Sequence, residues 1–174
     1  TMLVLSPAAM DMPTFDNLMS DSGRTPRRQP VFDHEGVVKN AVDYLHNARW
    51  YFIETEITLP KTSTMKKVRI ADVMAWNPRE RTLYIIEAKA SWKDFQQDHK
   101  FMEYKDWCHL MAFAVPEELA TAARLWMDER DTPRAYGGVG LLVIPNDFGP
   151  RRMIRKPERR LMTRGAYPMV IERL

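Results

Sequence analysis

The sequence contains a single cysteine, Cys108, among its 174 residues. One cysteine cannot form a disulfide within the chain, and it excludes a zinc site built from several thiolates. The chain is therefore not a small secreted domain that disulfides hold together. We expect Cys108 to lie in the core as a small apolar residue, in a cytoplasmic protein that folds under reducing conditions.

Long apolar runs are also missing. No stretch reaches the roughly 18 apolar residues that a membrane span requires. The first ten residues have no basic cluster ahead of an apolar segment, so they match a signal peptide poorly. We therefore expect no membrane partner. An apolar content of 45% over this length predicts a globular domain with one core.

Two common kinds of site residue are scarce as well. The sequence has 7 glycines, and Gly137, Gly138 and Gly140 lack the spacing, the lysine and the helix of a phosphate-binding loop. The four histidines show no spacing typical of metal ligands. Of these, only His34 is a candidate for the mouth of a site, because it stands beside Glu35.

Residues 1–30 differ in composition from the rest of the chain. They hold four prolines and several methionines and serines, with no steady apolar period. This composition predicts an N-terminal arm or extension and not a second domain. Residues 31–174 then make up the predicted domain.

From Asp33 the pattern becomes regular. Apolar residues at steps of three and four predict a helix that Asp33 caps. Runs rich in β-branched and aromatic residues predict strands, with helices between the later ones. The expected strands are 51–59, 68–76, 82–90, 110–115 and 139–144 with a short edge at 153–154, and the expected helices are 33–48, 92–108 and 117–129. Three successive strands followed by alternation predict an α/β fold with a mixed central sheet flanked by helices.

Three charged residues interrupt the apolar pattern of the predicted strands. Asp72 lies in the second strand, and Glu87 and Lys89 lie in the third. Residues two apart in a strand project from one face, so Glu87 and Lys89 point the same way, and pairing of the two strands would bring Asp72 beside them. A structural ion pair is the simpler interpretation of any one Glu-x-Lys. The added aspartate and the helix after the lysine favour a metal site, since uncompensated charges are costly to bury.

A hard cation such as Mg²⁺ or Mn²⁺ fits this set of residues. Mg²⁺ prefers oxygen ligands and keeps several waters, and Asp72, Glu87 and the backbone carbonyl of Ala88 supply part of such a shell. The cation would polarise a phosphate oxygen and lower the pKa of a water. Lys89 would orient that water or stabilise the charge that builds on the phosphate. Asp72, Glu87 and Lys89 therefore predict hydrolysis of a phosphodiester.

The order of elements and the charged residues together resemble the PD-(D/E)xK nuclease superfamily. This resemblance implies a restriction-endonuclease-like core with the order α-β-β-β-α-β. More narrowly, several segments are similar to the MmcB-like DNA repair proteins of bacteria. These segments are Arg69–Val73, Ile86–Ser91, Asp94–Tyr104 and Phe113–Pro116, and the resemblance covers residues 33–145.

The resemblance implies a further metal ligand on the first helix. Superfamily members often direct an acid from this helix toward the metal, frequently through water, and Glu35 stands at that point. A first-turn acid also complements the helix dipole without any other role. Ala71 stands where the superfamily motif has a proline, a common departure that leaves the metal ligands in place. Asp94 and Asp98 match the MmcB-like pattern without an assigned role.

The resemblance also implies contacts with DNA from the helix after the lysine. In several branches this helix carries Gln and Tyr four residues apart. Lys100 and Tyr104 have that spacing, with lysine in place of Gln, so they would face the site one turn apart. Lys93 on the same predicted helix is a further candidate.

Basic residues are concentrated near the C-terminus, although the net charge is only +3. Seven of residues 151–164 are Arg or Lys, against one acid. Such a run is either a solvated face or a surface that contacts phosphates. With a nuclease-type site in the same domain, Arg151, Arg152 and Arg155 are candidate DNA contacts.

The sequence therefore predicts a Mg²⁺-dependent deoxyribonuclease that acts in DNA repair or processing. Two alternatives stay open. One is a non-catalytic DNA-binding or scaffolding module on the same fold, and the other is a structural or partner-binding protein in which the charged strand residues form ion pairs. A homodimer and a complex with a repair protein are both compatible with the sequence, which does not predict the form of the DNA.

Overall fold

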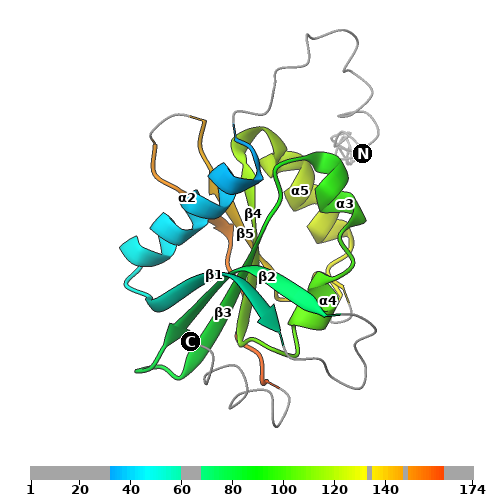
Figure 1. Ribbon diagram of the computed structural model, residues 1–174. Helices are drawn as coiled ribbons and strands as arrows, with labels where there is room; N and C mark the ends of the chain where they lie inside the picture. The colour runs from blue at the N-terminus through cyan, green and yellow to red at the C-terminus, as the bar shows by residue number, and fades with distance from the viewer. Residues whose placement is uncertain (1–31, 60–67, 133–134, 147–148, 163–174) are drawn as a thin grey trace, which may run out of the picture.

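A six-stranded sheet forms the centre of the molecule (Figure 1). The computed structural model describes residues 32–59, 68–132, 135–146 and 149–162. The predicted arm over residues 1–30 lies outside the described residues. Along the chain the elements are α2 (His34–Asn47), β1 (Tyr51–Leu59), β2 (Arg69–Asn77), β3 (Thr82–Ala88), α3 (Trp92–Gln97), α4 (Phe101–Tyr104), β4 (Leu110–Pro116), α5 (Glu117–Glu129), β5 (Gly140–Ile144) and β6 (Arg152–Arg155).

The strands stand in the sheet in the order in which they occur along the chain. β1, β2 and β3 form an antiparallel meander, whereas β3, β4 and β5 run parallel. β6 borders β5 in the antiparallel sense. Parallel neighbours need a crossover connection, which α3 and α4 provide before β4 and α5 provides before β5. The predicted α/β fold with a mixed sheet flanked by helices is confirmed.

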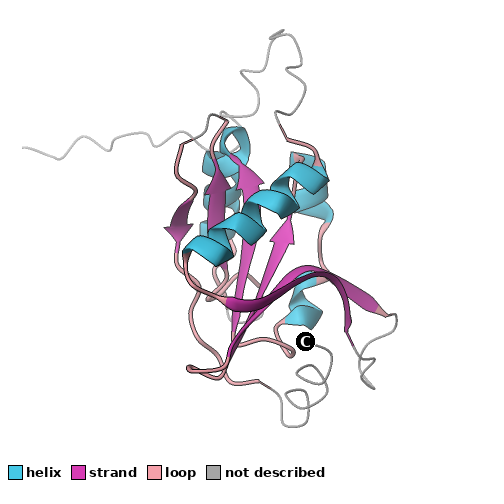
Figure 2. Ribbon diagram, turned by 60° about the vertical axis from the view of Figure 1, so that its left-hand side comes forward, coloured by secondary structure: helices cyan, strands magenta, loops and turns pink. Residues whose placement is uncertain are grey.

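Helix α2 covers one face of the sheet. Asp33 starts it, because its carboxylate accepts a hydrogen bond from the Gly36 N–H at 2.8 Å, as the N-cap pattern predicts. Val37, Ala41 and Leu45 recur at helical spacing and are fully buried. Figure 2 shows the helix lying across the strands, and it contacts each strand from β1 to β5. This packing fixes where the first turn of the helix meets the sheet.

Aromatic side chains dominate the core on the other face, beneath α3, α4 and α5. Phe95, Phe101, Phe113 and Tyr136 pack with ring centroids 4.8 to 6.3 Å apart, a range typical of aromatic pairs. Cys108 lies in the same core, where burial raises the pKa of its thiol to about 12. The prediction of a core cysteine is confirmed. The aromatic cluster ties α3 and α4 to β4 and so holds both short helices beside the strands that carry the charged residues.

The single helix predicted over 92–108 is wrong. The chain forms α3, leaves the helical conformation at Asp98, where ψ is 104°, and resumes as α4. The Asp98 carboxylate causes the break, because its Oδ1 accepts hydrogen bonds from the N–H groups of Lys100 and Phe101 at 2.7 and 3.3 Å. A short polar side chain that binds the backbone just ahead of it competes with helix continuation.

Several strand ends differ from the prediction by one or two residues. β3 ends at Ala88, two residues before its predicted end, yet the Lys89 N–H still donates to the Ala114 carbonyl at 2.9 Å. β4 includes Pro116, its last residue. The predicted short edge is present as β6. Within the ranges that the structure describes, no helix is both long enough and apolar enough to span a bilayer.

Candidate active site

Asp72 and Glu87 lie side by side on neighbouring strands. β2 and β3 pair in a register that sets Val73 opposite Ile86, which places Asp72 opposite Glu87. The Asp72 N–H donates to Glu87 Oε1 at 3.1 Å, and the Ala88 N–H donates to Asp72 Oδ2 at 2.8 Å. Each carboxylate is therefore held by the backbone of the opposite strand, at the point where regular pairing between the strands stops.

Lys89 joins the two carboxylates from the same face of the sheet. Its ammonium lies 3.7 Å from Glu87 Oε2, 2.6 Å from Asp98 Oδ2 and 3.9 Å from Asp94 Oδ1. The Ala88 side chain between Glu87 and Lys89 packs into the core under α2, so the predicted alternation is confirmed. The side chains of Glu87 and Lys89 are only 4% and 8% exposed. The three charged residues singled out in the sequence thus converge, with Glu87 and Lys89 buried and the Asp72 side chain 19% exposed.

Burial perturbs the ionisation of this cluster. Burial, with the charge of nearby Asp72, raises the pKa of Glu87 from 4.5 to about 8. Burial also raises the pKa of Asp72. For Lys89 burial lowers the pKa, but the negative charges of Asp98, Glu87 and Asp94 outweigh that effect and the pKa is raised overall. Of Asp72 and Glu87, Glu87 is therefore the carboxylate whose negative charge is the less stabilised by its surroundings.

Replacing Glu87 with glutamine should flatten the pH dependence of stability of the metal-free protein. The native state binds the Glu87 proton more tightly than the unfolded chain, since the pKa rises from 4.5 to about 8 on folding. The resulting stabilisation is complete below the unfolded pKa and is lost as the pH rises through the folded pKa. We expect the free energy of unfolding of wild type to fall relative to Glu87→Gln by about 5 kcal/mol across that window, at about 1.4 kcal/mol for each pKa unit.

Urea unfolding in EDTA at a series of pH values measures this difference. The variant should be the more stable protein at the alkaline end, because glutamine carries no charge to bury. Parallel curves for the two proteins would contradict a buried Glu87 with a raised pKa.

The first helix contributes His34 to the cluster. His34 Nε2 lies 3.6 Å from Asp72 Oδ1, and its side chain is 55% exposed. Glu35, the predicted ligand, is exposed in the first turn of α2, next to the residue that makes the contact. Because Asp33 caps the helix, His34 is its first residue and faces β2. His34 therefore stands at the mouth of the cluster, the place for which it was a candidate.

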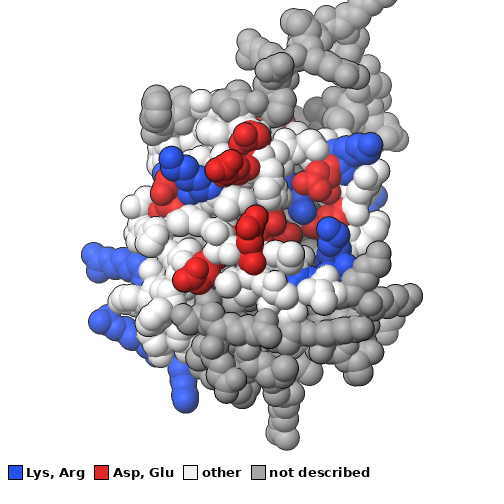
Figure 3. Space-filling model, in the orientation of Figure 1, with Lys and Arg blue, Asp and Glu red and all other residues white. Residues whose placement is uncertain are grey.

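Acidic side chains spread across the middle of the face that Figure 1 presents. Figure 3 shows them there, with Lys and Arg both at the edges of this face and directly beside the acids. In the described part of the chain, no three Asp, Glu, His or Cys side chains converge into a ready-made metal cage. A cation bound to Asp72 and Glu87 would depend on backbone oxygen and water for its other ligands, which is the donor set that Mg²⁺ accepts.

A model of the DNA repair protein MmcB-like family matches residues 27–129, more than half of the chain. The chain belongs to this family. The match covers α2 through α5, and with them Asp72, Glu87 and Lys89 of the MmcB-like chain. No curated protein matches it. A solved structure of a protein of unknown function from Silicibacter pomeroyi is similar, with a TM-score of 0.58, 20% identity and 84% of each chain covered. At that identity the similarity supports the fold alone.

The predicted DNA contacts on the helices after Lys89 lie in different environments. Lys93 in α3 and Lys100 at the start of α4 are exposed. Tyr104 is 1% exposed, and its hydroxyl donates to the Ile70 carbonyl at 2.9 Å. In this MmcB-like domain the two lysines are therefore open to a phosphate backbone, whereas Tyr104 ties α4 to β2.

The basic C-terminal segment, which lies outside the family match, is engaged with the domain itself. Arg151 donates to Asn40 at 2.9 Å and to Asp43 at 2.8 Å, both on α2. The other two candidates also bind acids, since Arg152 reaches Glu117 and Arg155 reaches Asp131 at 2.8 and 2.6 Å. These contacts attach Arg151, just before β6, to α2 on one face of the sheet, and attach β6 to α5 and the residues after it on the other. Arg152, whose side chain is 59% exposed, is the most open of the three.

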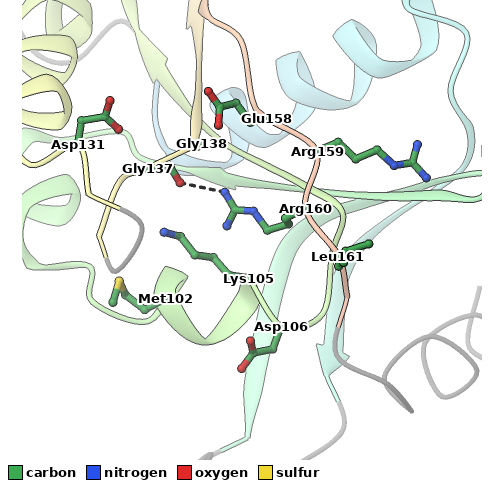
Figure 4. A pocket seen from close by; sticks show the side chains of 10 residues that line it. All are labelled: Met102, Lys105, Asp106, Asp131, Gly137, Gly138, Glu158, Arg159, Arg160 and Leu161. Carbon is green, nitrogen blue, oxygen red and sulfur yellow. Dashed lines mark hydrogen bonds between the residues drawn. The ribbon is translucent and has the colours of Figure 1, made fainter.

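A pocket of about 740 Å³ lies away from the carboxylates. Figure 4 shows Lys105 and Arg160 extending into it, and Arg160 donates to the Gly137 carbonyl at 3.1 Å. The pocket borders the beginnings of the parallel strands, because the Arg160 N–H bonds the His109 carbonyl just before β4. Asp72, Glu87 and Lys89 lie instead where β3 ends, the side of a parallel sheet on which α/β proteins bind ligands. The pocket is lined by three acidic and three basic residues, so their charges balance and do not favour an anionic ligand. We therefore place the candidate site at Asp72 and Glu87.

Sequence reasoning missed the role of Asp98. It predicted that Asp98 belonged to an uninterrupted helix, whereas the residue is 4% exposed and pairs with Lys89. The signal in the sequence was the aspartate itself, because Asp side chains accept hydrogen bonds from backbone N–H groups two and three residues ahead and so compete with a continuing helix.

Proposed function

We propose that this MmcB-like protein is a metal-dependent nuclease of the PD-(D/E)xK kind, which hydrolyses phosphodiester bonds of DNA in repair or processing. The observation that carries the proposal is the pair of neighbouring carboxylates on β2 and β3, of which Glu87 is buried and Asp72 is half-buried. Asp72 and Glu87 lie opposite each other, and the Lys89 ammonium is nearer to Asp98 than to Glu87. Two adjacent carboxylates, one buried and one half-buried, favour a bound cation, because their like charges are otherwise costly to hold together away from water.

The oxygens of the pair that accept no backbone N–H suit Mg²⁺ or Mn²⁺. Asp72 Oδ1 faces His34 at 3.6 Å and Glu87 Oε2 faces Lys89 at 3.7 Å, both beyond hydrogen-bond distance. These oxygens, with the backbone carbonyl of Ala88, would supply the hard donors that such cations prefer. When bound, the cation supplies Lewis acidity toward a phosphate oxygen and lowers the pKa of a water.

The side chains of the site have separate tasks in this reaction. Asp72 and Glu87 fix the cation at the end of β3, where each carboxylate is itself fixed by a backbone N–H. Lys89 holds a positive charge beside Glu87, where it orients the attacking water and stabilises the charge on the phosphate oxygens. Exclusion of bulk water strengthens each of these interactions.

The DNA partner is supported by the family and by the exposed lysines. MmcB-like proteins are described as DNA repair proteins. Lys93 and Lys100 are open to solvent on the helices after Lys89, so they can contact phosphates near a scissile bond. Glu35, exposed one residue after His34, is the residue of α2 that we propose binds the cation through water.

A non-catalytic DNA-binding or scaffolding module is the second candidate, and one contact favours it. The Lys89 ammonium lies 2.6 Å from the buried Asp98 carboxylate. A lysine so tightly held could serve only to stabilise the fold, in which case the domain would bind DNA without cleaving it.

The deciding experiment is cleavage of labelled single-stranded, duplex and branched DNA. Wild type and Glu87→Ala are assayed with Mg²⁺, with Mn²⁺ and with EDTA, and DNA binding is measured in parallel. We expect wild type to cleave at least one substrate with either metal, and both EDTA and the substitution to abolish cleavage while binding remains.

The outcomes separate the two candidates. Cleavage that survives in Glu87→Ala would assign the activity to a contaminant or to another site. Intact DNA binding with no cleavage of any substrate would overturn the nuclease and support the binding module. A protein that binds neither DNA nor metal would leave the charged cluster a structural feature.

A further inference from the structure

Asp98 differs from the other acids around Lys89 in how completely it is held. Its side chain is 2% exposed, against 51% for Asp94. Its Oδ1 accepts two backbone N–H groups at the start of α4. The orientation of the carboxylate is therefore set by the chain itself and does not depend on Lys89.

The second oxygen of the Asp98 carboxylate, Oδ2, contacts Lys89. Oδ2 is buried and, among the described residues, receives no hydrogen bond of good geometry, yet it lies 2.6 Å from the Lys89 ammonium. A buried carboxylate oxygen without any compensation is costly. The Lys89 ammonium therefore compensates the negative charge of this oxygen. The two N–H groups at the start of α4 orient the carboxylate so that Oδ2 points at the lysine.

The break between α3 and α4 is what makes this contact available. If the helix continued through 98–100, Oδ1 would lose its two N–H donors, since these groups would bond to carbonyls within the helix. The chain instead interrupts the helix and turns Asp98 into the core, behind the site. Because the helix is interrupted there, the negative charge of Asp98 is held 2.6 Å from the Lys89 ammonium.

The Lys89 ammonium would be mobile without a partner that holds it in place. A lysine side chain has four rotatable bonds and holds its ammonium as a mobile point charge. The Lys89 ammonium lies 2.6 Å from the Asp98 carboxylate and 3.7 Å from the Glu87 carboxylate. This contact keeps the ammonium next to the carboxylate that would bind the cation.

We infer that Asp98 is a positioning residue, which fixes the Lys89 ammonium beside Glu87 for reaction with DNA. The inference rests on the proposed nuclease function. Asp98 itself touches neither DNA nor the cation, so it acts through Lys89. Its loss should slow the chemical step without weakening the binding of DNA or of metal.

The test compares Asp98→Asn with Asp94→Asn in single-turnover and steady-state cleavage. Asparagine at 98 keeps the acceptor for the α4 N–H groups, but it places a neutral amide where the ammonium needs a negative charge. We expect kcat to fall by about 10–100-fold, the usual effect of losing a group that orients a catalytic side chain, with KM and the Kd for DNA unchanged. Asp94→Asn, which removes an exposed carboxylate at 3.9 Å, should have a clearly smaller effect on kcat.

Several results would overturn the inference. If Asp98→Asn cleaves at the wild-type kcat, or loses kcat and DNA affinity together, Asp98 does not position Lys89. An effect of Asp94→Asn equal to that of Asp98→Asn would point to a general loss of negative charge. If wild type cleaves no substrate under any condition, the proposed function itself is overturned. This outcome is distinct from a failure of the inference, because wild type and both variants are then equally inactive.

Discussion

Asp72→Asn should reduce Mg²⁺-dependent cleavage of DNA by about 10³-fold, comparable to the loss of a principal electrostatic group from an active site. Asparagine retains an oxygen that can accept the 2.8 Å hydrogen bond from the Ala88 N–H, so the strand end should keep its shape. What is lost is one of the two negative charges that would hold the cation. Calorimetric titration with Mg²⁺ should show weaker binding, and DNA affinity in EDTA should stay unchanged.

A matched control is Glu118→Gln, which also removes one carboxylate charge. Glu118 is exposed in the first turn of α5, and cleavage by this variant should equal that of wild type. Thermal unfolding of Asp72→Asn tests whether the variant is folded. A folded Asp72→Asn that cleaves at the wild-type rate would show that Asp72 does not hold the reacting metal.

Lys89→Met should lower the free energy of unfolding of the metal-free protein by about 3–5 kcal/mol, the usual cost of removing one partner from a buried ion pair. Asp98 would remain buried at 2% exposure with no cation beside it, and Glu87 would lose its neighbour at 3.7 Å. Urea unfolding in EDTA near neutral pH, followed by tryptophan fluorescence, measures the loss.

A double variant isolates the contribution of the ion pair. Lys89→Met with Asp98→Asn removes both charges, so it should recover a substantial part of the stability that Lys89→Met loses. Arg124→Met, which breaks an exposed pair with Asp128 at 3.6 Å, should cost less than about 1 kcal/mol. Equal losses in Lys89→Met and Arg124→Met would mean that the Lys89 pair is as weak as a surface contact.

The strand residues of the candidate site could be predicted because their pattern is local. Glu87 and Lys89 share a face by the two-residue period of a strand, and Asp72 joins them once β2 and β3 pair. Burial of all the residues between Thr82 and Ala88 agrees with the apolar run that marked a central strand. The same short-range rules gave α2 its cap at Asp33 and gave α5 its bounds.

The environment of those residues could not be predicted, because it depends on contacts between distant segments. The helical period through 92–108 gave no sign that Asp98 would leave the helix to meet a lysine from the end of β3. Arg151 binds Asn40 and Asp43, which lie more than a hundred residues earlier in the chain. The basic run over residues 151–164 therefore gave no sign in the sequence that it would form ion pairs with the domain. Between His34 and Glu35, the choice of which side chain faces Asp72 depends on the angle at which α2 crosses the sheet.

The buried thiol of Cys108 makes the protein convenient to label. Cys108 is fully buried, and its raised pKa keeps it in the unreactive thiol form. An engineered cysteine at an exposed position such as Lys93 or Lys100 would therefore react alone with a maleimide dye or a nitroxide. Fluorescence transfer or spin-label distances to DNA carrying a second probe could then be measured in a chain whose native cysteine is left in place.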